Sequence, residues 1–112
     1  NGKIIILSLE PKKNEIPAFN LMKKKLKKSL IRDESYFNLI IKNNPKTIIR
    51  NFIFSVRISK TKYLQMIKDR YISTLLNFSD KQISDGLIEI RNKYKKELKF
   101  KDRLICLIIK NN

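Results

Sequence analysis

The stretch KIIILSL at residues 3–9 decides the fold, together with LICLII at residues 104–109 near the other end of the chain. Both runs are rich in Ile and Leu, and neither alternates between apolar and polar side chains. Such runs are typical of strands covered on both faces, as in the interior of a parallel sheet. Glu10 and Pro11 end the first run, because proline cannot donate a hydrogen bond to a neighbouring strand. We therefore expect two buried strands that lie side by side in one sheet.

Between these runs, the spacing of apolar side chains predicts one further strand and several helices. From residue 47 to residue 58 apolar and polar residues alternate, which predicts a strand covered on one face. Elsewhere apolar residues recur at three- and four-residue steps, and they predict helices at about 17–30, 33–42, 60–76 and 80–97. The expected fold class is therefore α/β, with a partial Rossmann-like sheet of about three strands, at 3–9, 47–58 and 103–110.

Local signals refine two of these helices. Ser79 and Gln82 have the spacing of a capping box, in which the two residues satisfy each other's free backbone N–H groups. Asp33 and the residue after it are expected to cap the helix at 33–42. Gly86 lies inside the last helix, where glycine costs about 1 kcal/mol relative to alanine. We interpret Gly86 as a position that another backbone approaches closely.

The composition of the 112 residues limits the chemistry. The chain has no His and one Cys, which excludes histidine-based catalytic triads, intramolecular disulfides and thiolate-rich zinc sites. Cys106 is expected to be a small buried residue in a reducing compartment, so we expect a cytoplasmic protein. The apolar runs are shorter than the roughly 18–20 residues that cross a bilayer, so no membrane span is expected. The length fits one domain, and because Asn1 replaces the usual Met, we expect residues 1–112 to be a single partial domain.

The net charge of +16 indicates a basic protein and has two explanations. Proteins that bind phosphate backbones or anionic lipid are often this basic. A genome rich in A and T codons produces the same charge without any binding partner, and 20 Lys, 19 Ile and 11 Asn fit that bias. Lysines gather on the polar face of the helix at 17–30, at Lys23, Lys24, Lys25, Lys27 and Lys28. A nucleic-acid contact and a solvated helix face both remain open.

Two kinds of catalytic or nucleotide site lack their required residues. Asp85 and Glu89 lie one helical turn apart, but basic residues surround them, and ordinary surface pairing explains them better than acid–base catalysis. Nucleotide phosphates are held by glycine-rich turns between a strand and a helix, and the chain contains only Gly2 and Gly86. The sequence therefore shows no complete catalytic centre.

Several short segments resemble one enzyme family. NGKIIIL at residues 1–7 looks like the turn and fifth strand of class I S-adenosylmethionine-dependent methyltransferases. RYISTL at 70–75, followed by FSD at 78–80 and by Gly86, resembles the helical insert before the last strand of some of these enzymes. FKDRL at 100–104 looks like the entry to their seventh strand. The resemblance implies that the chain is the C-terminal half of a methyltransferase-like fold, where it completes the sheet and builds part of the acceptor pocket.

The resemblance also implies a site. Tyr63, Arg70, Tyr71 and Ser73 would lie on a helical lid, with Arg70 meeting an acidic group on the acceptor and Tyr71 forming a wall. A structural role is the alternative, in which both tyrosines pack in the core and Arg70 ties the helix surface. Glu10 is a further candidate, because open α/β sheets bind ligands at the carboxyl ends of their strands.

Methyltransferases of this kind hold the cofactor with a glycine-rich loop after the first strand and an acidic residue at the end of the second. Neither element is present here. The resemblance therefore implies S-adenosylmethionine as the cofactor of the full-length protein and no cofactor for this chain alone. It also implies a missing N-terminal half as partner, a small-molecule acceptor, and no activity without that half. A small basic nucleic-acid-binding protein is the alternative function, and a structural module that pairs its sheet edge with a second copy is a third.

Overall fold

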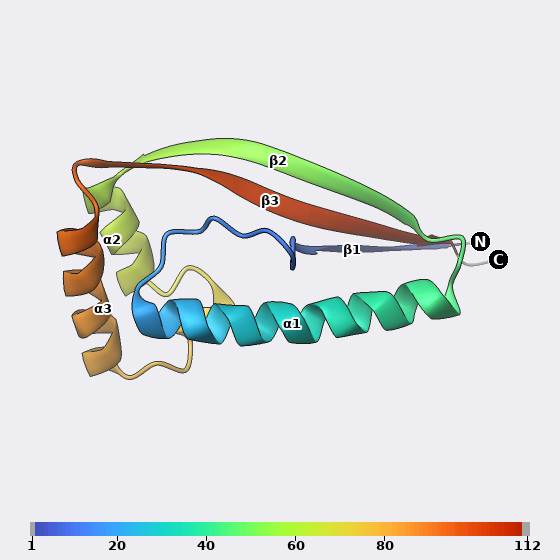
Figure 1. Ribbon diagram of the computed structural model, residues 1–112, viewed down its shortest axis with the longest axis horizontal. Coiled ribbons are helices and arrows are strands. Elements are labelled where there is room, and N and C mark those ends of the chain that lie inside the picture. Colours follow the sequence, from blue (N-terminus) through green and yellow to red (C-terminus); the bar gives the residue numbers. More distant parts are fainter. Residues whose placement is uncertain (1, 111–112) are drawn as a thin grey trace.

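The computed structural model describes residues 2–110, which form a three-stranded sheet with helices along one side and at one end (Figure 1). The architecture is mixed α and β, in agreement with the predicted class. The elements in chain order are β1 (Lys3–Leu9), α1 (Asn20–Asn43), β2 (Ile48–Ser59), α2 (Lys60–Lys68), the 3-10 turn η1 (Ser73–Leu75), α3 (Asp80–Lys93) and β3 (Glu97–Lys110). Figure 1 shows α1 beside the sheet, and α2 and α3 together at one end.

β3 is the central strand of the sheet, with β1 on one side and β2 on the other. Leu104 pairs with Leu9 of β1 and with Phe52 of β2, and both pairings are antiparallel. β1 and β2 therefore run parallel to each other with β3 between them. The two apolar runs do lie side by side, but the expectation of parallel neighbours is wrong. An unbroken apolar run predicts that both faces of a strand are covered, but it contains no information on the direction of the neighbouring strands.

The two apolar runs differ in how far they are covered. In β3, Cys106, Leu107 and Ile109 are buried, as double coverage predicts. In β1, Ile5 and Leu7 are 65% and 61% exposed, so the prediction of double coverage is wrong for this strand. β1 is an edge strand, so no strand of residues 2–110 lies on its outer side, and Ile5 and Leu7 share a face that the helices leave largely exposed.

α1 is one helix of 24 residues, and the prediction of two helices at 17–30 and 33–42 is wrong. Its buried face consists of Met22, Leu26, Leu30 and Phe37. This apolar face continues past Asp33, so packing overrides the local preference of an acidic residue for a helix start. The helix begins at Asn20, whose backbone N–H donates to the Glu89 carboxylate at 2.8 Å. The cap of α1 therefore comes from α3, which local sequence does not reveal.

Three other boundaries differ from the predicted ones. α2 ends at Lys68 rather than at 76, because Arg70 adopts a left-handed backbone conformation with φ 55°. α3 ends at Lys93 rather than at 97. β3 begins at Glu97 rather than at 103, because its first residues pair with the end of β2. The bounds of the predicted strand at 47–58 are confirmed to within one residue. The prediction that one of its faces is covered is wrong for the middle of the strand, where Phe52 and Phe54 are 42% and 52% exposed, because the main core lies at the helical end.

The main core lies at the helical end of the molecule, which comprises the start of α1, α2, η1, α3 and the first residues of β3. Its fully buried side chains include Met22, Tyr63, Ile67, Leu75, Ile90 and Leu98. A Cβ atom at Gly86 would lie 2.7 Å from ring atoms of Phe19, which packs against α3 there. The predicted close approach is therefore present, but its partner is an aromatic ring and the expectation of a backbone is wrong.

Candidate functional site

A cavity of about 170 Å³ lies where β1 and β2 reach their carboxyl ends and β3 begins. Its walls are mainly apolar side chains of the strands, of α2 and of the segment before η1. The polar groups that line it belong to Tyr63, Tyr71 and Asp102. Open α/β sheets bind ligands at this end of their strands, so the cavity is the candidate site.

Tyr63 and Tyr71 form a hydrogen-bonded pair in this cavity. The Tyr63 hydroxyl donates to the Pro17 carbonyl oxygen at 2.5 Å, and its oxygen lies 3.0 Å from the Tyr71 hydroxyl. Because a tyrosine has one hydroxyl proton and the Pro17 carbonyl can only accept, Tyr71 is the donor within the pair. The two rings meet edge to face with centroids 5.9 Å apart. Tyr63 is thus fully bonded, whereas the Tyr71 oxygen keeps its acceptor capacity.

The environment keeps both tyrosines neutral. Burial, followed by the neighbouring Tyr71, raises the pKa of Tyr63 far above its ordinary value. Burial also raises the pKa of Tyr71, and the nearby Asp102 carboxylate raises it further. These groups therefore act as neutral hydrogen-bonding walls at pH 7, and tyrosinate chemistry is disfavoured at this site.

Asp102 is the cavity residue that sequence reasoning missed. It pairs with Phe54 of β2 and lies two positions after Phe100, whose ring also contacts Tyr63 edge to face at 6.4 Å between centroids. Residues two apart in a strand share a face, so Asp102 points to the same side as Phe100. The sequence does contain a signal for Asp102, because it is a carboxylate on the same strand face as the apolar Phe100 and Leu104. It was missed because the strand was expected to begin at 103.

Arg70 follows α2 but turns its guanidinium away from this cavity. Its Nη1 donates to the carbonyl oxygens of Leu75 and Phe78 at 2.7 and 2.5 Å, and its Nη2 donates to Asp80 at 3.0 Å. These contacts from one side chain tie the end of α2 to η1 and to the start of α3. This arrangement agrees with the structural alternative for Arg70.

The remaining predicted site residues lie elsewhere. Ser73 is exposed at the start of η1 and lines a separate hollow beside β1 and α1. The Glu10 carboxylate accepts from the backbone N–H of Lys12 at 2.9 Å, and Glu10 lines another hollow with Arg103. Of the five predicted residues, the structure brings only Tyr63 and Tyr71 together in one cavity.

Within residues 2–110, no cluster of three or more His, Cys, Asp or Glu side chains could hold a metal ion. None of the described helices combines the length and the apolar character needed to cross a bilayer. Comparisons with protein-family models, curated proteins and solved structures found no match to this chain.

Proposed function

We propose that this chain is the C-terminal, acceptor-pocket-forming part of a class I S-adenosylmethionine-dependent methyltransferase and is inactive alone. The main support for the proposal is the open, apolar edge of the sheet at β1. β1 pairs with β3 along its full length, while its outer edge and the side chains of Ile4, Ile5 and Leu7 are uncovered. An exposed edge of this apolar character is a template for another strand. In the proposal, a strand from the N-terminal half pairs there.

The topology supports the same function. β1 and β2 run parallel and are joined by a long connection that contains α1, as in the crossover units of layered α/β folds. Sheets of such folds are often mixed, and in the proposal β3 is an antiparallel strand that lies between two parallel ones. The cavity with Tyr71 and Asp102 lies at the carboxyl ends of the two parallel strands, where these folds bind ligands.

We assign the roles from the contacts. Tyr71 and Asp102 face the acceptor, and Tyr63 positions Tyr71 through the hydroxyl pair. Arg70 positions the segment that carries Tyr71, because its guanidinium already binds Leu75, Phe78 and Asp80.

The described residues do not fit the methyl donor itself. The Phe19 ring occupies the space next to Gly86, so no cofactor phosphate or ribose fits there. Gly2 precedes β1, whereas a cofactor-binding glycine loop follows the carboxyl end of a strand. S-adenosylmethionine therefore belongs to the missing half.

The test is the reading frame upstream of Asn1. We expect a glycine-rich strand–loop–helix about a hundred residues earlier. The extended protein should bind S-adenosylmethionine in isothermal titration calorimetry, whereas residues 1–112 alone should not. An upstream frame without that segment, or an extended protein that leaves the donor unbound, would overturn the proposal.

A nucleic-acid-binding function is the second candidate, and the exposed lysines of α1 favour it. Lys23, Lys24, Lys27 and Lys28 are all exposed, whereas the Lys25 ammonium lies 5.1 Å from the centroid of the Phe78 ring. Binding to random duplex DNA should then fall steeply with salt concentration. An absence of binding at about 0.15 M salt would remove this candidate.

A further inference from the structure

We propose that a second cavity, beside the N-terminal half of α1, binds a small amphipathic anion, with a carboxylate or phosphate head and an apolar body. The cavity has a volume of about 420 Å³ and lies between α1, the loop after β1 and the end of α3. This volume is within the range of small-molecule sites. The inference concerns a site other than the Tyr71 cavity, and it stands whether or not the chain belongs to a methyltransferase.

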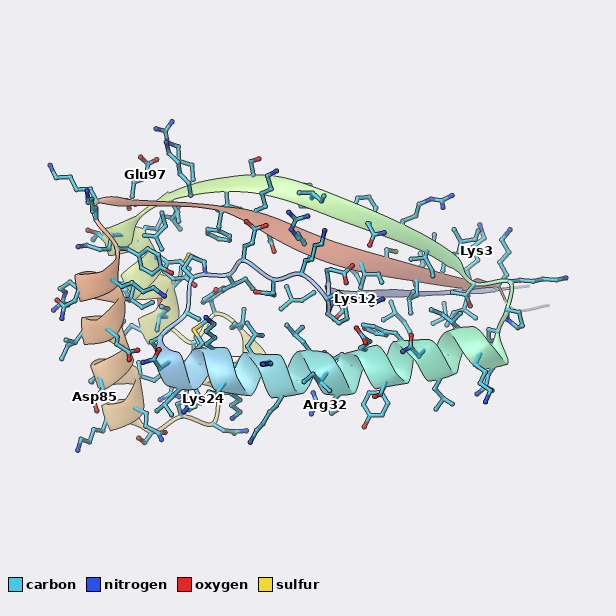
Figure 2. All side chains as sticks on the ribbon, viewed as in Figure 1. Lys3, Lys12, Lys24, Arg32, Asp85 and Glu97 are labelled. Carbon is cyan, nitrogen blue, oxygen red and sulfur yellow. The ribbon has the colours of Figure 1, made fainter. Side chains whose placement is uncertain are left out.

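Four lysines from three separate segments converge on this cavity. They are Lys12 of the loop, Lys23 and Lys27 of α1, and Lys93 at the end of α3. Figure 2 labels Lys12 on the loop between the sheet and α1, and Lys24 on the helix itself. Lys24 and Lys28 lie on the same helix but do not line the cavity.

The positive charge of the cavity is not neutralised by its own lining. Glu15 is the carboxylate that lines it, and its Oε2 accepts from the Arg103 Nε at 2.8 Å. Within residues 2–110, none of the four lysines forms an ion pair. Lys23 and Lys27 are four residues apart on one helix, where like charges repel. A bound anion would relieve this repulsion and pair with several ammonium groups at once.

The floor of the cavity is apolar. Ala18, Leu26 and Leu30 are buried beneath it, and Ile31 contributes a side chain that is 62% exposed. Tyr94 adds an aromatic surface, and the Lys93 ammonium lies 5.5 Å from the centroid of its ring. A lysine rim above an apolar floor matches a ligand with a charged head and an apolar body better than it matches a bare phosphate backbone.

The loop that carries Lys12 is held in place before any ligand arrives. The Glu10 carboxylate accepts from the Lys12 backbone N–H, and the Asn14 side chain accepts from the Ile16 backbone N–H, both at 2.9 Å. The Tyr63 hydroxyl fixes the end of this loop by donating a hydrogen bond to the Pro17 carbonyl oxygen. A preformed rim lowers the ordering cost of binding.

The probes are decanoate and decyl phosphate, each titrated into the full 112-residue chain by calorimetry at about 0.15 M salt. Decylamine serves as the oppositely charged control and 1-decanol as the neutral one. We expect at least one anionic probe to bind at least tenfold more tightly than both controls, and the tighter of the two anions identifies the head group. Amide chemical shifts in NMR should change around Leu26, Ile31 and Tyr94.

A matched pair of variants distinguishes binding in this cavity from nonspecific attraction to the net positive charge of the protein. Lys23→Gln/Lys27→Gln should weaken the binding of the anionic probes at least tenfold, whereas Lys24→Gln/Lys28→Gln should leave it within about twofold. Both variants remove two exposed charges from the same helix, so circular dichroism should show the fold unchanged. The proposal would be overturned if the two variants weakened binding equally, or if all four probes bound equally well. It would also be overturned if no probe bound, or if the NMR shifts were centred on β1.

Discussion

Isoleucine side chains of the main core are buried at the helical end of the molecule, whereas those of Ile4 and Ile5 on β1 are exposed. Ile67 of α2 is completely buried, whereas Ile5 of β1 is 65% exposed. A fully buried isoleucine contributes about 1.5–3 kcal/mol through the hydrophobic effect, and an exposed one contributes little. The helical end therefore supplies its own core, while β1 presents apolar surface at an unpaired edge. The apolar content of a segment therefore does not by itself measure how much that segment stabilises the fold.

Alanine substitutions at Ile67 and Ile5 should have very different effects on stability. Ile67→Ala should lower the free energy of unfolding by about 3–4 kcal/mol, because it leaves a cavity in the main core. Ile5→Ala should change it by less than about 0.5 kcal/mol. Urea denaturation of both variants measures the contrast. Equal losses would show that β1 is covered in solution, for example by a second copy of the chain.

Gly86 tests how tightly the helical end is packed. Gly86→Val should cost about 3 kcal/mol, since the new side chain would overlap the Phe19 ring. Ser84→Val, on the exposed side of the same helix, is the control and should cost less than about 1 kcal/mol. Similar losses would mean that Phe19 moves aside freely and that the contact does not restrict this position.

The buried hydroxyl of Tyr63 joins the helical end to the loop after β1. Tyr63→Phe should cost about 2 kcal/mol, because the Pro17 carbonyl loses its donor in a buried place. Tyr36 is 57% exposed, and Tyr36→Phe should cost less than about 0.5 kcal/mol. Thermal unfolding of the two variants provides the measurement, and an unchanged melting temperature for Tyr63→Phe would contradict the buried hydrogen bond.

The same tyrosine predicts a dependence on alkaline pH. Its pKa is raised on folding, so above about pH 10 the unfolded chain releases the phenol proton while the folded chain keeps it. The contribution of the Tyr63 phenol to the free energy of unfolding is therefore fully present below about pH 10. Above that pH it falls by up to about 1.4 kcal/mol per pH unit. Tyr63→Phe should show a shallower fall between pH 10 and 11. Parallel curves for the two proteins would disprove the assignment.

The smallest effect concerns the capping box of α3. The Ser79 Oγ accepts from the Gln82 backbone N–H, and the Gln82 side chain accepts from the Ser79 backbone N–H. Ser79→Ala should therefore cost about 1 kcal/mol. Ser84→Ala, inside the same helix, should be neutral or slightly stabilising. An unaffected Ser79→Ala variant would mean that tertiary packing alone fixes the start of α3.

Local patterns predicted several elements correctly because the responsible forces act over a few residues. The alternation after residue 47 located β2, and Ser79 with Gln82 located the start of α3. The long α1 was predicted as two helices because the charged residues near Asp33 resemble a new start. The candidate site was predicted only in part. Tyr63 and Tyr71 meet because they lie eight residues apart around the end of α2, but Asp102 reaches them only through strand pairing.

The mixed α/β class, the apolar character of both end strands, the absence of His and the excess of positive charge can all be read from the amino-acid sequence. These properties follow from side-chain type and short-range spacing. Tertiary packing is needed to place β3 between β1 and β2 and antiparallel to both, to leave β1 uncovered, and to bring Glu89 to the start of α1. Each of these depends on contacts between residues far apart in the chain, and such contacts are chosen by the packing of the whole molecule.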